Sequence, residues 1–246
     1  MKKIVVVTGG NSGIGEACAF RFALEDYHVV ICARRENLNR EVVQRVRAAG
    51  GSAEQFMVDL RDATAIAKLF DAITMRHSRI DSLVNCAGIE GTPFVSFEAY
   101  PDEVFDDVMA INVKAPWLCM KRVLPLMREQ RSGTIVNVAS LAGLRASVTG
   151  GVGYTASKHA LVGVTKSAAR EYAVHQVRVN AVCPAFVRTP MAQSVVGCDI
   201  DQYGPSHPIN RVCEKNEVAD VVYWLCSDQS SFVTGVAIPV DGGVLA

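Results

Sequence analysis

A tyrosine and a lysine with complementary acid–base chemistry stand four residues apart in the second half of the sequence, as Tyr154 and Lys158. Residues at this spacing share one face of a helix, so the phenol and the ammonium can converge on one bound molecule. Ser140 follows a predicted strand and adds a hydroxyl that can hydrogen-bond a reacting oxygen. The three side chains predict proton transfer to or from an oxygen of a small molecule.

A glycine-rich turn opens the chain, at residues 8–15 with the sequence TGGNSGIG. It follows a short apolar run and precedes an amphipathic helical pattern, the context in which such a turn binds a dinucleotide. Glycines let the backbone approach a pyrophosphate, whose charge then meets the N-terminus of the helix. Together with the tyrosine and the lysine, the turn predicts a hydride-transfer enzyme, although a glycine-rich loop without a ligand is the alternative. The turn residues expected at the cofactor are Gly9, Asn11, Ser12, Gly13, Ile14 and Gly15.

Short β-branched runs alternate with longer helical patterns along the chain, which predicts a buried parallel sheet. Parallel strands need crossover helices, and these cover both faces of the sheet. We therefore expect an α/β fold with a doubly wound, seven-stranded parallel sheet. The predicted strands are residues 4–7, 28–32, 54–58, 82–84, 134–138, 178–182 and 236–240, and the predicted helices include residues 13–25, 37–49 and 63–76.

The 246 residues, half of them apolar, can bury one sizeable core, so we expect a single domain over residues 1–246. No repeat, low-complexity tract or linker interrupts the pattern. The least regular segment, residues 189–211, combines glycines and prolines late in the chain. It is expected to form a substrate lid.

The charges balance, with 25 Lys plus Arg residues against 25 Asp plus Glu residues, and no basic run stands out. Neither a nucleic-acid surface nor a membrane patch is therefore expected. The opening apolar run is too short for a signal peptide, and no stretch approaches the roughly 20 apolar residues of a membrane span. The eight cysteines form no C-x-x-C pair and accompany no histidine cluster, so we expect no metal site and reduced thiols in the cytoplasm.

The order and spacing of these motifs resemble the single-domain members of the short-chain dehydrogenase/reductase family. Residues 8–15 match the motif T-G-x-x-x-G-x-G in full, residues 85–88 read N-C-A-G where the family has N-N-A-G, and the ending at 231–243 is similar to the family's last strand. The resemblance implies a Rossmann-type, NAD(P)-dependent oxidoreductase that interconverts a ketone and a secondary alcohol. A 3-oxoacyl-type or a small cyclic or aliphatic carbonyl compound would be its substrate. A non-catalytic dinucleotide-sensing or scaffold protein on the same fold is the alternative.

The resemblance further implies a catalytic tetrad of Asn112, Ser140, Tyr154 and Lys158. Tyr154 is the implied general acid/base, and its pKa must fall by about two to three units, which a neighbouring ammonium and a cationic nicotinamide would favour. Lys158 would also hold the nicotinamide-ribose hydroxyls, and Ser140 would stabilise the reacting oxygen. Asn112 would hold a helix backbone open to a water that links Lys158 to solvent.

Further cofactor contacts are implied after the third and fourth predicted strands. The Asp59 carboxylate would accept a hydrogen bond from the adenine amino group with Leu60 beside it, unless Asp59 only caps the next helix. Small residues at 85–88 would let the chain pass under the adenine ribose, unless they form only a strand-ending turn. The other residues implied at the cofactor are Asn85, Ala87, Gly88, Tyr154, Lys158, Pro184, Val187 and Thr189.

The choice between the two nicotinamide cofactors depends on the end of the second strand. NAD-preferring relatives usually carry an acid where Ala33 stands, and that acid would repel a 2′-phosphate by roughly 4 kcal/mol for unit charges about 4 Å apart. Arg34 offers a planar guanidinium suited to phosphate, and Arg35 adds to the field. NADP(H) is therefore favoured and NAD(H) is the other candidate, while two arginines that merely open a surface helix are the alternative.

The specific substrate does not follow from the sequence. Glu90 and Arg145 are candidate pocket residues, and the alternative is that both are solvated loop charges. Ser140 and Tyr154 are separated by one residue more than in the commonest family pattern, and the extra residue is expected to bulge over the substrate. The candidate pocket residues are Glu90, Phe94, Arg145, Ser147, Val152, Met191 and His207.

A stripe of small residues along the helix that starts at Tyr154 would allow close packing against a partner helix. The family counterpart of this helix packs across a subunit interface, so we expect a homotetramer. A role in the core alone is the alternative. The stripe comprises Ala156, Ala160, Gly163 and Ser167, and the neighbouring helix at 113–127 would offer Trp117, Met120 and Leu124.

Overall fold

The structure is a computed structural model that describes residues 2–147, 149–197 and 199–246, so Val148 in the expected substrate loop and Cys198 in the expected lid lie outside the described residues. Within them, seven strands form one parallel sheet in the order β3-β2-β1-β4-β5-β6-β7. The strands are β1 (Ile4–Thr8), β2 (His28–Ala33), β3 (Ser52–Met57), β4 (Ser82–Asn85), β5 (Gly133–Val138), β6 (Val177–Pro184) and β7 (Ala237–Val240). The predicted fold is confirmed.

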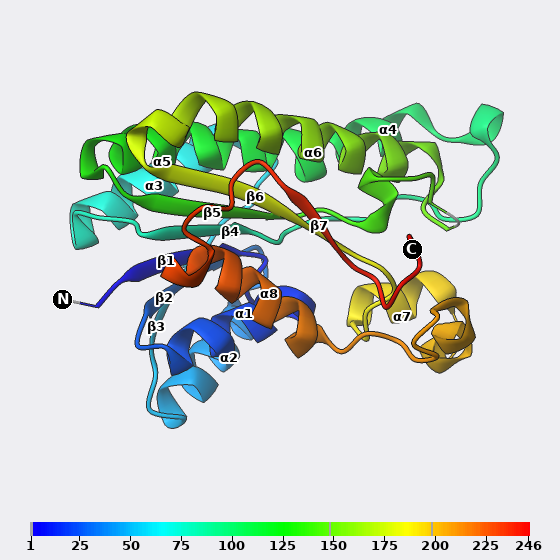
Figure 1. The fold of residues 1–246 in the computed structure, drawn as a ribbon, viewed down its shortest axis with the longest axis horizontal. Helices are drawn as coiled ribbons and strands as arrows, with labels where there is room; N and C mark the ends of the chain where they lie inside the picture. The colour runs from blue at the N-terminus through cyan, green and yellow to red at the C-terminus, as the bar shows by residue number, and fades with distance from the viewer. Residues whose placement is uncertain (1, 148, 198) are drawn as a thin grey trace.

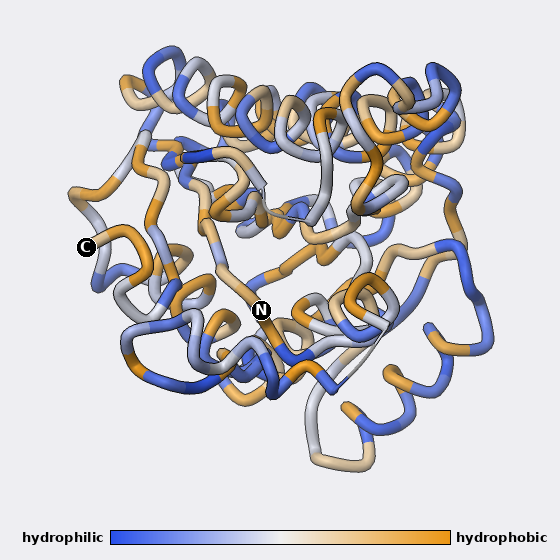
Figure 2. Tube along the Cα trace, turned by 90° about the vertical axis from the view of Figure 1, so that its right-hand side faces the viewer, coloured by the Kyte–Doolittle hydropathy of each residue, from blue (hydrophilic) through white to orange (hydrophobic). Residues whose placement is uncertain are grey.

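Helices cover both faces of this sheet, as Figure 1 shows, with α3, α4, α5 and α6 on one side and α1, α2 and α8 on the other. Around the outer helices, hydrophobic and hydrophilic segments of the tube alternate within each turn, as expected for helices with one buried face (Figure 2). The helices are α1 (Gly13–Leu24), α2 (Glu36–Ala48), α3 (Ala63–His77), α4 (Asp102–Met109), α5 (Ala115–Gln130), α6 (Gly151–Tyr172), α7 (Pro190–Val196) and α8 (Lys215–Cys226).

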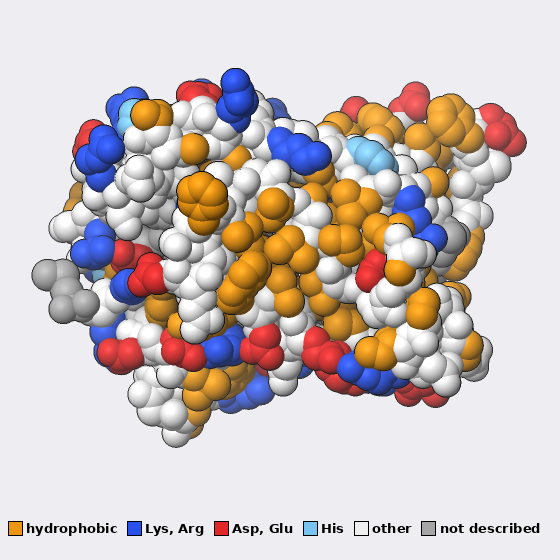
Figure 3. Space-filling model, viewed as in Figure 1, with side chains coloured by type: hydrophobic (Ala, Val, Ile, Leu, Met, Phe, Trp, Pro, Cys, Tyr) orange, Lys and Arg blue, Asp and Glu red, His pale blue; other side chains and the backbone are white. Residues whose placement is uncertain are grey.

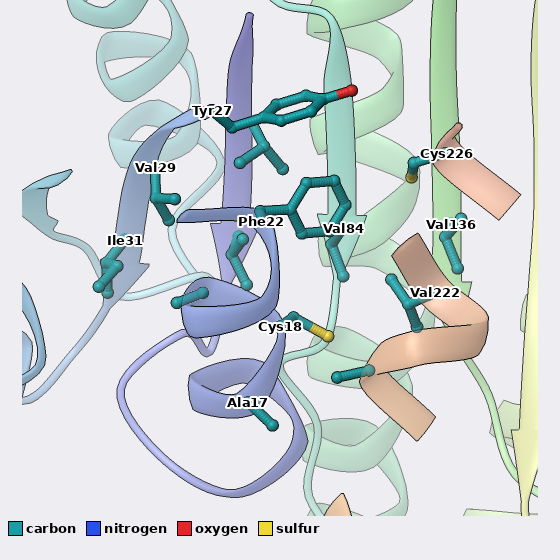
Figure 4. Close-up of a cluster of buried hydrophobic side chains, with 14 of the residues drawn as sticks. Ala17, Cys18, Phe22, Tyr27, Val29, Ile31, Val84, Val136, Val222 and Cys226 are labelled. Atoms are coloured by element: carbon teal, nitrogen blue, oxygen red, sulfur yellow. The ribbon is translucent and has the colours of Figure 1, made fainter. Parts of the chain in front are cut away.

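The sheet has a hydrophobic core on each face, because parallel strands that are covered on both sides bury nearly every side chain. The residues of β1 at Val5, Val6 and Val7 have no exposed surface. On the α1 and α8 face, Phe22 lies between the strands and α8 and meets Tyr27 edge to face, with ring centroids 5.1 Å apart (Figure 4). These cores fix the strand ends that carry the candidate site.

The strand order reverses between β1 and β4, and the chain leaves β1 and β4 toward opposite faces of the sheet. Such a switch point leaves a crevice outside the carboxyl ends of the strands, where ligands bind in open α/β sheets. Two predicted strand boundaries shift by two residues in the structure, and several others shift by one. β3 begins two residues before the predicted start, and β6 continues to Pro184, two residues past the predicted end.

The helices α4 and α5 are joined by a π-helical segment, Ala110–Lys114, so that the backbone is helical from Asp102 to Gln130. The expected lid is more regular than its composition suggests. It holds α7, whose N-cap Thr189 accepts a hydrogen bond from the Ala192 amide, and the 3-10 helix Ile200–Ser206. Among the described residues, no helix combines the length and apolar character that crossing a bilayer requires.

Candidate active site

A groove of about 310 Å³ lies at the carboxyl ends of β1, β2, β3 and β4, where the switch point predicts it. The glycine-rich turn forms one wall because its backbone packs directly against the turn after β4. A Cβ atom on Gly9 would lie 2.9 Å from the Ala87 backbone, and Gly9 has a φ of +66°. The predicted residues that line the groove are Gly9, Asn11, Ser12, Gly13, Ile14, Arg34, Arg35, Asp59, Leu60, Ala87, Gly88, Tyr154, Lys158 and Thr189.

Gly15 and Asn85 do not line this groove. A Cβ atom on Gly15 would lie 2.3 Å from the Gly9 carbonyl oxygen, so this glycine lets the turn pack on its own helix. The Asn85 side chain is buried within the sheet, where its Nδ2 donates to Asn137 Oδ1 at 2.8 Å. Asn137 in turn donates to Thr165 Oγ1 on α6. Gly15 and Asn85 therefore support the groove through packing and hydrogen bonds beneath its surface, and do not face a ligand.

A buried asparagine that the sequence analysis missed supports the turn. Asn39 on α2 is fully buried, and its Oδ1 accepts a hydrogen bond from Asn11 Nδ2 at 2.7 Å. Its Nδ2 donates to the Ala33 carbonyl at 2.9 Å. One amide thus connects the glycine-rich turn to the end of β2. Because Asn11 and Asn39 are 28 residues apart in sequence, no local pattern indicates their contact.

Positive charge gathers around the end of β2. Arg34 and Arg35 are exposed and line the groove next to Ala33, which is itself buried. Arg35 donates from Nη2 to the Ser12 hydroxyl at 3.3 Å. Arg61, which the sequence analysis did not single out, lines the same end of the groove.

Asp59 lies in the groove after β3, but its carboxylate is already held by an arginine two residues on. Arg61 donates to both carboxylate oxygens of Asp59, at 3.3 and 3.1 Å, and these bonds hold the pKa of Asp59 below its ordinary value. The helix cap suggested as an alternative role belongs to Asp62, whose side chain accepts from the Thr64 and Ala65 amides. An Asp-x-Arg spacing is the local signal for the pair.

Tyr154 and Lys158 lie on one face of α6, as their spacing predicts, with the Lys158 ammonium 5.4 Å from the centre of the Tyr154 ring. Lys158 is buried, and its Nζ donates to the Val138 carbonyl at the end of β5, at 3.1 Å. Burial lowers the pKa of Lys158 to about 8. A Cβ on Gly88 would lie 3.5 Å from this Nζ, so the N-C-A-G turn passes directly over it.

The pKa of Tyr154 moves in the opposite direction to the predicted one. Burial of the phenol raises it, the Glu90 carboxylate raises it further, and a hydrogen bond with Ser140 only partly offsets both effects. The lysine is itself destabilised as a cation by the same burial, so it does not produce the expected lowering in the chain alone.

The other two tetrad residues lie next to this pair. Ser140 follows β5 and caps a short 3-10 turn, its Oγ accepting from the Ala142 amide at 3.1 Å. Asn112 is fully buried inside the π-helical segment. Its amide donates to the Ile89 carbonyl at 2.8 Å and to Ser157 Oγ at 3.1 Å, and its Oδ1 accepts from the Ile89 amide at 2.9 Å. A π turn inside a helix frequently marks a functional site.

A second cavity, the pocket, has a volume of about 670 Å³ and lies beside the groove. Ile14, Ala139, Tyr154, Thr189 and Met191 line both cavities, so Tyr154 stands in the wall between them. In the space-filling view, hydrophobic side chains gather in the middle of the face that carries β7 (Figure 3). The predicted catalytic and pocket residues that line the pocket are Glu90, Ser140, Arg145, Ser147, Tyr154, Met191 and His207. Of the predicted cofactor contacts, Thr189 lines both cavities, whereas Pro184 and Val187 line the pocket and not the groove.

Phe94 and Val152, proposed as pocket residues from the sequence, do not line it. Phe94 is 63% exposed, and its amide bonds the Thr149 carbonyl instead. His207 is almost fully buried, with Nδ1 near the Tyr203 carbonyl at 3.0 Å, and its Nε2 has no partner among the described residues.

Glu90 is a pocket residue and not a solvated loop charge. Burial raises the pKa of its carboxyl, which accepts a hydrogen bond from Thr149 Oγ1 at 3.3 Å. A Cβ on Gly150 would lie 2.5 Å from its Oε1, so the loop after β5 closes tightly over the carboxyl group. Arg145, by contrast, is exposed at the edge of the pocket.

Comparison with known proteins identifies the lineage of this site. Residues 9–245 match the family model described as enoyl-(acyl carrier protein) reductase. The chain is 35% identical to the 3-oxoacyl-[acyl-carrier-protein] reductase FabG of Thermotoga maritima, over 99% of this chain and 98% of that protein. The chain belongs to the short-chain dehydrogenase/reductase family.

Other members of the short-chain dehydrogenase/reductase family are similarly close. The chain is 35% identical to levodione reductase of Leifsonia aquatica, over 98% of this chain and 93% of that protein. The crystal structure of a variant of actinorhodin polyketide ketoreductase with NADPH has a TM-score of 0.93 and 36% identity, covering 99% of this chain and 97% of that one. This chain is accordingly an NAD(P)-dependent oxidoreductase that interconverts a ketone and a secondary alcohol.

Proposed function

We propose that this oxidoreductase binds its dinucleotide in the groove and its carbonyl substrate in the pocket, with Tyr154 as the acid–base group between them. The observation that carries the proposal is the position of Tyr154 in the wall that both cavities share. A phenol in that wall can exchange a proton with the substrate oxygen while the substrate carbon faces the groove. The other tetrad residues, Asn112, Ser140 and Lys158, surround it.

The groove fits a nicotinamide dinucleotide. Glycines stand where the turn after β1 meets the turn after β4. Because they carry no side chains, backbone amides of the glycine-rich turn and the N-terminus of α1 can face the groove. When bound, the nicotinamide ring supplies the hydride for carbonyl reduction or accepts it in the reverse reaction. Residues at the Lys158 end of the groove would hold the nicotinamide ribose, and Asp59 and Leu60 at the other end would meet the adenine.

The proton path follows from the contacts of the tetrad. Ser140 hydrogen-bonds Tyr154 and would also donate to the substrate oxygen as negative charge develops there. Lys158, with a pKa of about 8, can give up or take a proton near neutral pH. Asn112 would keep the π turn open beside Lys158, since its amide already fixes Ile89 and Ser157.

NADP(H) is the cofactor that the charges around β2 favour. Ala33 places no carboxylate where a 2′-phosphate would lie, and Arg34, Arg35 and Arg61 bring positive charge to the same end of the groove. The arginine at 61 is occupied by Asp59, so we assign the phosphate contact to Arg34 and the supporting field to Arg35.

The pocket suits a compact carbonyl substrate with a second polar group. Its apolar side includes Phe186, whose ring lies 4.5 Å from that of Tyr203. Glu90, which is half-buried, and His207, which is buried, add polar groups to its lining, and either can meet a second oxygen of the substrate. A small cyclic ketone satisfies these conditions, and Arg145 at the edge would suit a 3-oxoacyl group on an anionic carrier.

The proposal further includes a single domain per chain, assembly of the chains into a homotetramer, and a location in the cytoplasm. On α6, a Cβ on Gly163 would meet no described atom within 4 Å, and Trp117 on α5 is 45% exposed. Both are therefore free to pack against another chain. Met120 and Leu124, expected to be available there, are buried instead, because they face α3 and the sheet.

The test is an assay of the purified protein with a panel of cyclic ketones, 3-oxoacyl thioesters and secondary alcohols, monitored at the nicotinamide absorbance with either cofactor. Turnover of at least one compound supports the proposal. Tight binding of the dinucleotide with no turnover across the panel would favour the alternative of a non-catalytic sensing protein.

A further inference from the structure

Two histidines and a glutamate meet at the end of the sheet opposite to the active site. His28 opens β2, Glu54 lies in β3, and His77 ends α3. All three side chains are largely buried, with 19%, 12% and 15% of their surface exposed. None of them lines the groove or the pocket, so the catalytic site leaves this cluster unexplained.

The three side chains converge on a single point. One nitrogen or oxygen atom from each lies within 4.8 Å of the other two. His28 Nε2 is 3.4 Å from Glu54 Oε1, and His77 Nε2 hydrogen-bonds the same oxygen. The two imidazole rings have centroids 4.9 Å apart.

One ring nitrogen in the cluster is buried without a hydrogen bond. His28 Nδ1 is 2.7 Å from Ser52 Oγ, and His28 Nε2 has no partner by hydrogen-bond geometry among the described residues. If Nδ1 carries the ring proton and donates it to Ser52, the lone pair of Nε2 faces Glu54 Oε1. A fixed histidine tautomer with a free Nε2 lone pair is how a metal-ligating histidine is prepared.

We propose that His28, Glu54 and His77 form a binding site for a divalent metal ion, with Zn²⁺ as the ion that fits best. Two imidazole nitrogens and one carboxylate oxygen are a common zinc ligand set, and a water completes the tetrahedron. Zinc bonds of about 2.0 to 2.2 Å place tetrahedral ligand atoms roughly 3.3 to 3.5 Å apart, close to the His28–Glu54 separation.

Binding replaces one hydrogen bond by metal bonds. His77 shifts its ring proton to Nδ1, so that the Nε2 lone pair and the Glu54 Oε1 that it now contacts both turn to the ion. The Glu54 carboxylate already contacts His77 through Oε1 and Arg76 through Oε2, so the ion replaces the first contact and leaves the second in place.

The positive charge of Arg76 should weaken metal binding at this site, which gives the proposal a specific test. Its guanidinium pairs with Glu54 Oε2 and lies 5.3 Å from the Phe56 ring centre, so it competes for charge but leaves Oε1 for the metal. Removing this cation should strengthen metal binding. A cluster that serves only to pack β3 against α3 would lose stability in the same variant and bind no metal.

The experiment is a titration of the full-length, chelator-treated protein with Zn²⁺ by isothermal calorimetry. We expect one ion per chain, an affinity weakened at least about tenfold in His28→Ala and in His77→Gln, and an affinity strengthened in Arg76→Gln. His175→Ala, which changes a half-buried histidine elsewhere, should bind as the wild type does. Binding that survives both cluster variants, or no binding by the wild type, overturns the proposal.

A second measurement uses the wild-type protein and so does not depend on how well the variants fold. In protein labelled with ¹⁵N-histidine, Zn²⁺ should shift the ring resonances of two of the five histidines, convert one of them (His77) to the Nδ1–H tautomer and leave the other (His28) in that tautomer. The melting temperature should rise with added Zn²⁺. Ring resonances that stay in place, or that shift only for other histidines, would contradict the site.

Discussion

Arg35 donates a hydrogen bond to the hydroxyl of Ser12, at 3.3 Å, and so connects the end of β2 to the glycine-rich turn. The turn has no basic residue of its own, since residues 11 and 12 are asparagine and serine. The guanidinium therefore brings positive charge to the turn, and the proposed preference for NADP(H) depends on this arrangement.

We expect Arg34→Ala to weaken NADP(H) binding by roughly 1.5 to 3 kcal/mol, the range of a hydrogen bond to a charged group, and to leave NAD(H) almost untouched. Ala33→Asp should reverse the preference, because it adds a ribose acceptor and a repulsive charge together. Catalytic efficiencies with both cofactors measure this. Arg40→Ala, which removes an exposed arginine of α2, is the control. Equal use of both cofactors by wild type and Arg34→Ala would show that Arg34 only opens a helix.

Tyr154→Phe should lower turnover by at least about a hundredfold while cofactor affinity stays unchanged, because it removes the proton donor and keeps the ring. Steady-state kinetics and fluorescence titration with the reduced dinucleotide separate the two effects. Tyr172→Phe, at the far end of the same helix, is the matched control. Near-normal turnover of Tyr154→Phe would refute the proposed role of the phenol.

Glu90→Gln should lower the pKa of Tyr154, since it removes the carboxylate that raises it. The phenolate then forms at lower pH. The pH profile of alcohol oxidation should move to lower pH by up to about one unit, at pH values where the wild-type Glu90 is ionised. The exposed Glu98→Gln should leave the profile in place. An identical profile in both variants would mean that Glu90 does not act on the phenol.

Lys158→Met tests the cost of burying the ammonium. The pKa of Lys158 is about 8 in the folded chain against an ordinary value of 10.5, so between these values the unfolded chain holds a proton that the folded chain has lost. Unfolding then takes up a proton, and stability rises with pH. We expect wild type to gain about 3 kcal/mol relative to Lys158→Met across this window. Urea unfolding without cofactor measures it, and a constant difference would contradict the shift.

Gly163→Arg tests the proposed tetramer. Nothing described lies within 4 Å of a Cβ at this position, and an arginine suits a helix interior better than glycine by roughly 0.8 kcal/mol. The variant should therefore keep its fold, shown by circular dichroism, and lose the interface across α6. Sedimentation should give a tetramer for wild type and a smaller species for the variant. A wild-type protein that sediments as a monomer at micromolar concentration rules the assembly out.

Much of the fold and of the candidate site could be predicted from local sequence patterns. The predicted runs matched all seven strands to within two residues at each end, and the inner strands were recognisable because strands buried on both faces are continuously apolar. The four-residue spacing predicted that Tyr154 and Lys158 share one helix face, because the helical period is also a local property. Contacts between distant segments could not be predicted, among them Asn11 with Asn39 and the meeting of His28 with His77.

Burial explains the predictions that failed. The sequence shows that Lys158 is close to Tyr154, but the direction of each pKa depends on how much water surrounds the pair, which only the packed structure gives. Met120 and Leu124 look available in an amphipathic pattern, yet they face α3 across a covered side of the sheet. Their position depends on the helix before them.

The π turn at Ala110–Lys114 sets the phase of everything that follows it in the same helix. Such a turn holds one more residue than an α-helical turn, and one residue corresponds to about 100° of rotation around the axis. If the same residues wound as a uniform α-helix instead, α5 would rotate by about that angle against α4. Met120 would leave the core and a polar flank would face the sheet, so the segment that holds Asn112 also keeps the helix in register.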